Sequence, residues 1–150
     1  MTRPLNLENA VIGFRNFEGR EGQFNKSGDR SFAVFLNRQY AEELAEEGWN
    51  IKFPKDNGSP DPDDNGRDPY LQVSVAFDYY PPNVFLVSGD RPQRLHEDEI
   101  GMLDWAEIST VDLVIRPYEW QVSGKSGIKA YLKAGYFTIE TDAFAKKYGV

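Results

Sequence analysis

Apolar and polar residues alternate with a period of two over several segments of the chain, and this alternation predicts β-strands. The clearest examples are residues 111–122 and 127–139, which we expect to pair as a hairpin, and residues 70–78 before them. Residues 9–17 and 30–37 predict a second hairpin, joined by a stretch that is rich in glycine. The pattern as a whole therefore predicts a mostly β protein.

Two segments between the strands carry the wider apolar spacing of short helices. Residues 38–47 form one expected helix, which Asn37 caps and Gly48 ends. A short strand is expected to follow over residues 49–53. The other helix is expected within residues 95–107, where the side chains turned toward the core would be Ile100, Leu103 and Trp105.

Proline and glycine indicate where the chain turns. Residues 79–82, Tyr-Tyr-Pro-Pro, predict a turn after which residues 83–88 return as a strand. Residues 54–69 are nearly all Pro, Gly, Asn and Asp, which predicts a flexible acidic loop. With 150 residues and no internal repeat, the chain is expected to form one domain over residues 1–150. The most economical fold is a small barrel, closed or partly open, with one or two short helices.

The last predicted hairpin separates its side chains into two different faces. We expect a two-residue turn centred on Gly124 and Lys125. One face is then apolar and includes Ile115 and Leu132. The other combines aromatic rings with cations, opposed in the pairs Trp120–Lys129, Tyr118–Tyr131 and Arg116–Lys133. Because two opposed cations repel each other, this second face predicts a polyanionic ligand.

The charge of this hairpin differs from that of the chain as a whole. The formal net charge is -7 and the sequence pI is about 4.8, which argues against nucleic acid unless positive charge is concentrated locally. Residues 115–136 contain four cations and a single acid, Glu119. Aromatic rings among cations suit single-stranded nucleic acid, because each stacked base contributes roughly 1–3 kcal/mol. An ordinary exposed strand surface, on which Tyr, Trp and Lys are common, is the alternative interpretation.

The first predicted hairpin adds cations that lie among phenylalanines, and its glycines would let the tip close over a strand of DNA. Nearby acids nearly cancel its charge, so this signal is weaker. The predicted DNA-binding residues of both hairpins are Arg15, Phe17, Arg20, Lys26, Arg30, Arg116, Tyr118, Trp120, Lys125, Lys129, Tyr131 and Lys133.

Three stretches of the chain resemble a family of single-stranded DNA-binding proteins encoded by bacteriophages. They are FRNFEGREG at residues 14–22, IRPYEW at 115–120 and GIKAYLK at 127–133. The resemblance implies a mostly β fold, a small antiparallel barrel of the oligonucleotide/oligosaccharide-binding (OB) type with one or two short helices. It also implies a sequence-tolerant protein that coats and protects single-stranded DNA during phage DNA replication or recombination. Replication proteins are the further partners that this role suggests, and oligomerisation is compatible with it.

The chain offers little for catalysis or metal binding. It contains no cysteine, and its one histidine, His96, stands in a polar stretch. Residues 61–66 match only the first half of a calcium loop, because Gln72 stands where that loop needs Glu. Residues 124–126, Gly-Lys-Ser, lack the earlier glycine of a phosphate-binding loop. We therefore expect no enzymatic activity, no cofactor and no metal.

Hydropathy bears on where the protein acts. No apolar run approaches the roughly 20 residues of a membrane span, and the first residues lack the apolar stretch of a signal peptide. We therefore expect a soluble protein in the cytoplasm of the host cell, without membrane contact. A second functional class stays open: an acidic protein-interaction or DNA-mimic module that docks on a basic partner through residues 97–107 and 54–69.

Overall fold

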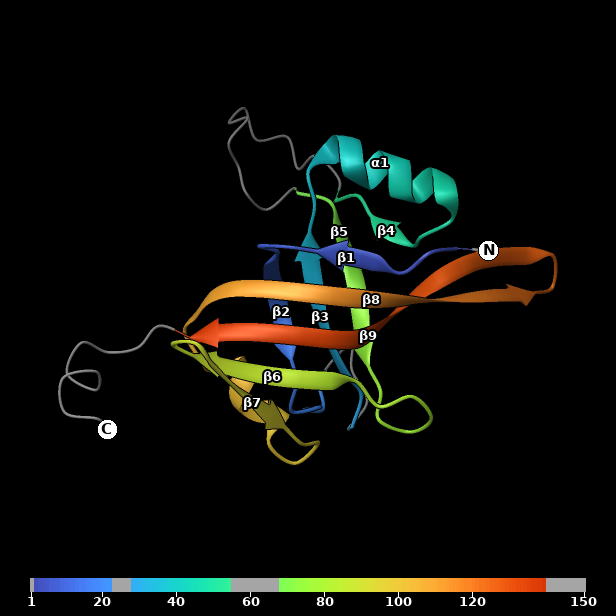
Figure 1. The fold of residues 1–150 in the computed structure, drawn as a ribbon. Coiled ribbons are helices and arrows are strands. Elements are labelled where there is room, and N and C mark those ends of the chain that lie inside the picture. The colour runs from blue at the N-terminus through green and yellow to red at the C-terminus, as the bar shows by residue number, and fades with distance from the viewer. Residues whose placement is uncertain (1, 23–27, 55–67, 140–150) are drawn as a thin grey trace, which may run out of the picture.

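The computed structural model describes residues 2–22, 28–54 and 68–139 (Figure 1). Most of the predicted acidic loop over residues 54–69 lies outside the described residues, and so does Lys26. Within the described ranges the chain is mostly β, as predicted, with one α-helix and one short 3₁₀ helix.

Most of the strands follow the predicted pattern. In chain order they are β1 (Leu5–Leu7), β2 (Val11–Asn16), β3 (Arg30–Phe35), β4 (Ile51–Lys52), β5 (Tyr70–Val75), β6 (Asn83–Ser88), β7 (Arg91–Leu95), β8 (Ile108–Val122) and β9 (Lys125–Ile139). The helix α1 (Arg38–Glu47) lies between β3 and β4, and the 3₁₀ helix η2 (Ile100–Asp104) lies between β7 and β8. Strand β7 was not expected, because its sequence, Arg-Pro-Gln-Arg-Leu, does not alternate; it forms by pairing with β6.

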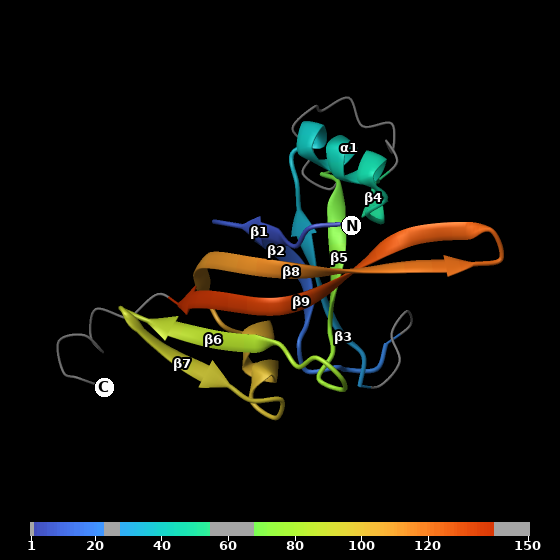
Figure 2. The ribbon, with the colours of Figure 1, turned by 45° about the vertical axis from the view of Figure 1, so that its right-hand side comes forward.

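The strands form one mixed sheet that is not closed into a barrel, whereas a small antiparallel barrel, closed or partly open, was predicted. Its main path runs β1-β8-β9-β5-β3-β2, while β4 pairs with β5, and β6 pairs with β7 and β9. Strands β5 and β6 run parallel to β9. Residues 83–88 form the strand β6 after the proline turn, as predicted, and this strand pairs with β7 and β9 and not with β5, because a proline turn does not choose the neighbouring strand. Figures 1 and 2 show β2, β3 and β5 crossing β8, β9 and β6 at a steep angle.

The core lies where these two sets of strands cross. Its centre contains Phe17, Phe32 and Phe137, each at most 1% exposed. The ring centroid of Phe17 lies 5.1 Å from that of Phe32 and 5.4 Å from that of Phe137. Such aromatic pairs add to the hydrophobic stabilisation that their burial provides. Phe17 is therefore a core residue, and its predicted role in DNA binding is wrong.

The two helices pack against this core. In α1, Asn37 Oδ1 accepts a hydrogen bond from the Tyr40 backbone N–H over 2.8 Å, and Gly48 ends the helix at φ 108°, both as predicted. In η2, Ile100 and Leu103 are fully buried, as predicted. The expected burial of Trp105 is wrong, since its side chain is 73% exposed. A 3₁₀ helix has three residues per turn, so positions 100 and 103 share the buried face, and the helix ends before Trp105.

Strands β8 and β9 form the predicted hairpin, but the turn lies one residue earlier than expected. Ser123 and Gly124 occupy it with φ of 50° and 80°, the two positive values that a tight hairpin turn of this type requires. Between Ile115 and the turn, each residue of β8 therefore faces a partner in β9 two positions before the predicted one. A shift of two residues keeps the side chains of this part of the hairpin on their predicted faces. Ile115 and Leu132 are buried, as predicted, and Tyr118 and Tyr131 lie on the opposite face.

One consequence of the shift is that Arg116 faces Tyr131 and not Lys133. The predicted repulsion between two opposed cations is therefore absent from this pair. Lys133 is the extra residue of a β-bulge, since Ile115 pairs with Leu132 while Val114 pairs with Ala134. Beyond the bulge, the buried and the exposed positions of β9 are exchanged relative to the predicted alternation.

Candidate functional site

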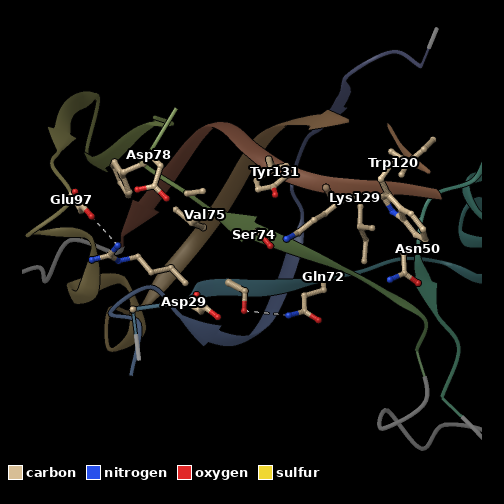
Figure 3. A pocket seen from close by; sticks show the side chains of 18 residues that line it. Asp29, Asn50, Gln72, Ser74, Val75, Asp78, Glu97, Trp120, Lys129 and Tyr131 are labelled. Carbon is tan, nitrogen blue, oxygen red and sulfur yellow. Dashed lines mark hydrogen bonds and ion pairs between the residues drawn. The ribbon is translucent and has the colours of Figure 1, made fainter. Parts of the chain in front are cut away.

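A groove of about 710 Å³ opens beside the hairpin of β8 and β9 (Figure 3). Its walls come from the beginning of β3, from β5 and the residues after it, and from the β8–β9 hairpin. Asn50, just before β4, closes one end near Trp120, and Glu97 and Asp78 lie at the other end (Figure 3). The groove therefore joins segments that are distant in the sequence.

Pairing across the sheet explains why these side chains meet. Ser31 of β3 lies opposite Ser74 of β5, and Ser74 lies opposite Tyr131 of β9. Residues directly opposite each other project from the same face of a sheet. Buried residues alternate with these positions in β5 and in this part of β9, so the row of Ser31, Ser74 and Tyr131 lies on the outer face. Gln72 and Lys129, each two residues away along its strand, lie on the same face.

Aromatic rings and cations gather at the Trp120 end of this surface. The Trp120 ring lies against the backbone of Gly127, where an added Cβ would be 2.9 Å from a ring carbon. Lys129 Nζ is 5.0 Å from the centroid of the Tyr131 ring. The Tyr118 and Tyr131 rings meet edge to face at 6.1 Å. Trp120 is 36% exposed and Tyr118 is 52% exposed, so their rings are accessible to a ligand.

Arg116 lies between two aromatic rings, which the sequence did not predict. Its guanidinium carbon is 5.0 Å from the ring centroid of Tyr131 and 4.8 Å from that of Tyr80. Guanidinium groups favour such positions over ring faces. Tyr80 comes from the connection between β5 and β6, so its approach to β8 depends on the sheet topology. A partly exposed cation held by two rings is pre-organised to contact an anion.

The other end of the groove is acidic. Arg30 Nη1 forms an ion pair with Glu97 over 3.1 Å, and Asp29 and Asp78 line the same end. The Arg30 guanidinium also lies 5.7 Å from the centre of the Phe77 ring. The groove thus has a cationic, aromatic end and an acidic end. A polyanion is attracted to the first and repelled by the second.

The remaining predicted residues of the first hairpin have structural contacts. Arg15 Nη1 donates to the backbone carbonyls of Leu103 and Ala106 at 2.7 and 3.0 Å, and so fastens β2 to the end of η2. Arg20 lies 3.5 Å from the Asp104 carboxylate and stacks over Trp105 at 5.2 Å. Neither Arg15 nor Arg20 lines the groove.

Two further predicted cations lie on the β8–β9 hairpin. Lys125, next to the turn, and Lys133, at the bulge, are both exposed and lie outside the groove lining. The sequence patterns did not point to Asn50, Gln72 or Ser74 as site residues. The alternation of residues 70–75 does place Gln72 and Ser74 on an outer face, but only the parallel pairing of β5 with β9 brings that face to the hairpin.

On the side of the hairpin away from the aromatic face, Glu119 has a partner close to the N-terminus. The Thr2 hydroxyl donates a hydrogen bond to Glu119 Oε1 over 2.5 Å. This bond stabilises the carboxylate and lowers the pKa of Glu119 below its usual value. The first residues are thereby held against the hairpin.

The described part of the chain contains neither a metal cluster nor a membrane-spanning helix. Among these residues, no group of three or more His, Asp or Glu side chains is arranged to hold a metal ion. No helix within the described ranges is long and apolar enough to cross a membrane.

Two solved structures of a bacteriophage protein resemble the fold of this chain. The single-stranded DNA-binding protein of bacteriophage Enc34, in a C-terminally truncated form, has a similar structure, with a TM-score of 0.57 and 14% sequence identity. The match covers 93% of this chain and 87% of that chain. The same phage protein in complex with ssDNA also gives a TM-score of 0.57 at 14% identity, over 94% of this chain and 89% of that one. At such low identity the likeness shows the fold alone.

The sequence itself decides the family. No curated protein matches it. The family model of the phage ssDNA-binding domain, however, matches residues 1–150, which confirms the resemblance that the sequence motifs indicated. The chain therefore belongs to the family of phage ssDNA-binding domains.

Proposed function

We propose that this phage single-stranded DNA-binding protein holds its ligand in the groove beside the β8–β9 hairpin. Bases stack on Trp120, Tyr118 and Tyr131, while Lys129 and Arg116 contact the phosphates. The observation that carries this proposal is the convergence of Trp120, Lys129 and Tyr131 in one groove with the outer face of β3 and β5. Family membership over the whole chain favours this function over the acidic docking module.

The strand order supports an OB-type assignment for the sheet. Strands β1 and β2 end the main path on opposite sides, yet only residues 8–10 separate them in the sequence. The Ala10 N–H donates to the Val111 carbonyl over 2.8 Å, which brings the start of β2 to β8. We infer that the sheet curls until β1 and β2 act as one bent strand of a partly open barrel. In that fold, nucleic acid lies across the second and third strands, here β3 and β5.

This mode of binding is tolerant of base sequence. Every base has a π-face that can stack on an aromatic ring, and phosphates are the same at every position. A protein that binds in this way can coat single-stranded DNA and protect it during replication or recombination in the cytoplasm of the infected cell. Replication proteins are the partners that this role suggests.

Titration of labelled oligothymidine at several salt concentrations tests the proposal. Trp120→Ala should weaken binding by roughly 1–3 kcal/mol, because one stacked base is lost, and should leave the salt dependence largely unchanged. Lys129→Ala should reduce the slope of log K against log salt by about 0.7, the value for one phosphate contact with a single strand. The two variants therefore separate stacking from charge.

Two controls make the test specific. Trp120→Phe keeps an aromatic face and should retain most of the affinity. Arg91→Ala removes an exposed cation at the tip of the β6–β7 hairpin, which points away from the β8–β9 tip in both views (Figures 1 and 2), and should leave the salt slope unchanged. If Trp120→Ala and Lys129→Ala are folded and bind as tightly as the wild type, DNA does not lie in this groove.

A further inference from the structure

The outer face of β3 and β5 continues past the groove into an aromatic surface. The pairs Ser31–Ser74, Ala33–Gln72 and Phe35–Tyr70 follow one another along the two strands. The next row after Gln72 is therefore only about 7 Å away, since a strand rises about 3.4 Å per residue. This row belongs to the end of the groove where Asn50 and Trp120 lie, because Asn50 directly precedes β4, which pairs with Tyr70 and Leu71.

Phe14 completes this surface in an unusual way. It is 72% exposed and has φ of 47°, a left-handed conformation that bulky residues rarely adopt. The pairing of β2 with β3 shifts between Gly13 and Asn16, so Phe14 lies in a bulge. Such a bulge can redirect a side chain. The Phe14 ring centroid lies 5.9 Å from that of Phe35 and 5.6 Å from that of Tyr70.

Neither packing in the core nor the backbone preference of phenylalanine explains the exposed ring and left-handed backbone of Phe14. A ring that leaves 72% of its residue exposed contributes little hydrophobic burial. Phe35 in turn lies so close to Gly13 that an added Cβ there would be 2.6 Å from its ring. Backbone strain that displays an exposed ring is typical of functional positions. The three rings together present a stacking surface.

Charge also favours a path of single-stranded DNA that leaves the groove toward Phe14. Lys52 lies opposite Tyr70 and is exposed, so a cation stands in the same row as the rings. The opposite exit is lined by Asp29, Asp78 and Glu97. A phosphate backbone that passes Lys129 is therefore attracted toward Lys52 and repelled from the acidic end.

We propose that Phe14, supported by Phe35 and Tyr70 and flanked by Lys52, is a second base-stacking site that extends the path of single-stranded DNA beyond the groove. This inference rests on the proposed function of the groove. The strand runs from Trp120 and Lys129 across the outer face of β5 and β3 to Phe14 on β2. Short oligonucleotides fill the groove alone, and longer ones also reach Phe14.

Oligonucleotide length tests this proposal. Oligothymidines of about 4 and about 16 nucleotides span the range of site sizes of single OB folds. Phe14→Ala should weaken binding of the longer one roughly 5- to 150-fold, the equivalent of one stacked base, and leave the shorter one unaffected. Phe14→Tyr should restore binding, whereas Phe14→Leu, which keeps apolar bulk without an aromatic face, should not. Thermal melting of each variant checks that it is folded.

Trp105→Ala is the matched control, because Trp105 is as exposed as Phe14, at 73%, but follows η2 beyond the acidic end of the groove. It should bind both oligonucleotides as the wild type does. The proposal is overturned if Phe14→Ala binds the longer oligonucleotide normally, or if it weakens the binding of both oligonucleotides equally. It is also overturned if Trp105→Ala, and not Phe14→Ala, weakens the binding of the longer oligonucleotide alone. A photo-reactive phenylalanine analogue at position 14 should crosslink to the longer oligonucleotide, and absence of that adduct also contradicts the proposal. Failure of the groove itself would instead show as normal binding of the shorter oligonucleotide by Trp120→Ala.

Discussion

The carboxylate of Asp104 holds the end of β2 against the body of the protein. Its side chain is 1% exposed. One oxygen accepts a hydrogen bond from the Phe17 backbone N–H over 2.7 Å, and the other accepts from the Glu18 N–H over 3.2 Å. Arg20 Nη2 lies 3.5 Å from the second oxygen. The substitution Asp104→Ala removes all three contacts at once.

The expected loss of stability follows from these contacts. Hydrogen bonds to charged groups contribute about 1.5–3 kcal/mol each, and an unpaired buried N–H, as Phe17 would have, costs about 1–3 kcal/mol. The contributions overlap and do not add, and the ion pair with the half-exposed Arg20 contributes little. We therefore expect Asp104→Ala to lower the free energy of unfolding by about 3 kcal/mol. For a chain of this size this corresponds to a fall in Tm of about 6 to 12 °C.

Thermal melting followed by circular dichroism measures this directly, with urea unfolding as a second assay. Asp98→Ala is the matched control, because Asp98 is an exposed acid on the segment that leads into η2, and its removal should leave Tm nearly unchanged. Asp104→Asn should lie between the two, since it keeps one acceptor oxygen but places a donor near the second N–H. A melting temperature of Asp104→Ala within about 1 °C of the wild type would refute the argument, because the two hydrogen bonds would then contribute almost nothing.

Three further predictions concern other parts of the chain. Gly127→Ala should displace the Trp120 ring, which lies 2.9 Å from the new Cβ, and weaken oligothymidine binding with little change in the salt slope. Asn37→Ala removes the cap of α1 and should lower the free energy of unfolding by about 1 kcal/mol in urea titrations, with binding unchanged. The hydrogen bond from Thr2 lowers the folded-state pKa of Glu119, so its stabilising effect is present above the unfolded pKa and is lost as the pH falls through the folded pKa. In an NMR titration, Thr2→Val should raise the pKa of Glu119, and an unchanged value would contradict the role of this bond.

Side-chain faces could be predicted from the sequence more reliably than pairing partners. The alternation of β8 and β9 correctly placed Ile115 and Leu132 in the core and Tyr118 and Tyr131 outside, although the turn was placed one residue late. The period of a strand is two residues, so an error of two in register leaves every face unchanged. The cap of α1 was also predictable, because Asn37 and Gly48 act on their immediate neighbours.

Bulges and long-range strand pairings could not be predicted from the sequence. The bulge at Lys133 reverses the alternation of β9, and the bulge at Phe14 brings its ring to the surface. Phe17, on the other side of that bulge, becomes a core residue in place of a predicted DNA contact. A bulge adds one residue to a strand, and the sequence on each side of it still alternates between apolar and polar positions. The alternation alone therefore does not reveal where the bulge lies. The parallel pairing of β5 with β9, which creates the groove, joins segments separated by more than 50 residues and has no local signal.

The distribution of charge explains how an acidic chain can bind a polyanion. Exposed charges are screened over about 8–10 Å at ordinary salt concentrations, so a phosphate at Lys129 or Arg116 responds to its neighbours and not to the net charge of -7. The acids that line the groove stand together at its far end, beyond Arg30. In the proposed binding mode only Lys129 and Arg116 contact phosphates, so we expect most of the affinity to come from stacking on aromatic rings. If DNA lies in the proposed groove, we therefore expect the aromatic rings around it to be the principal determinants of binding, and the charges at its two ends to set the direction in which the strand leaves it.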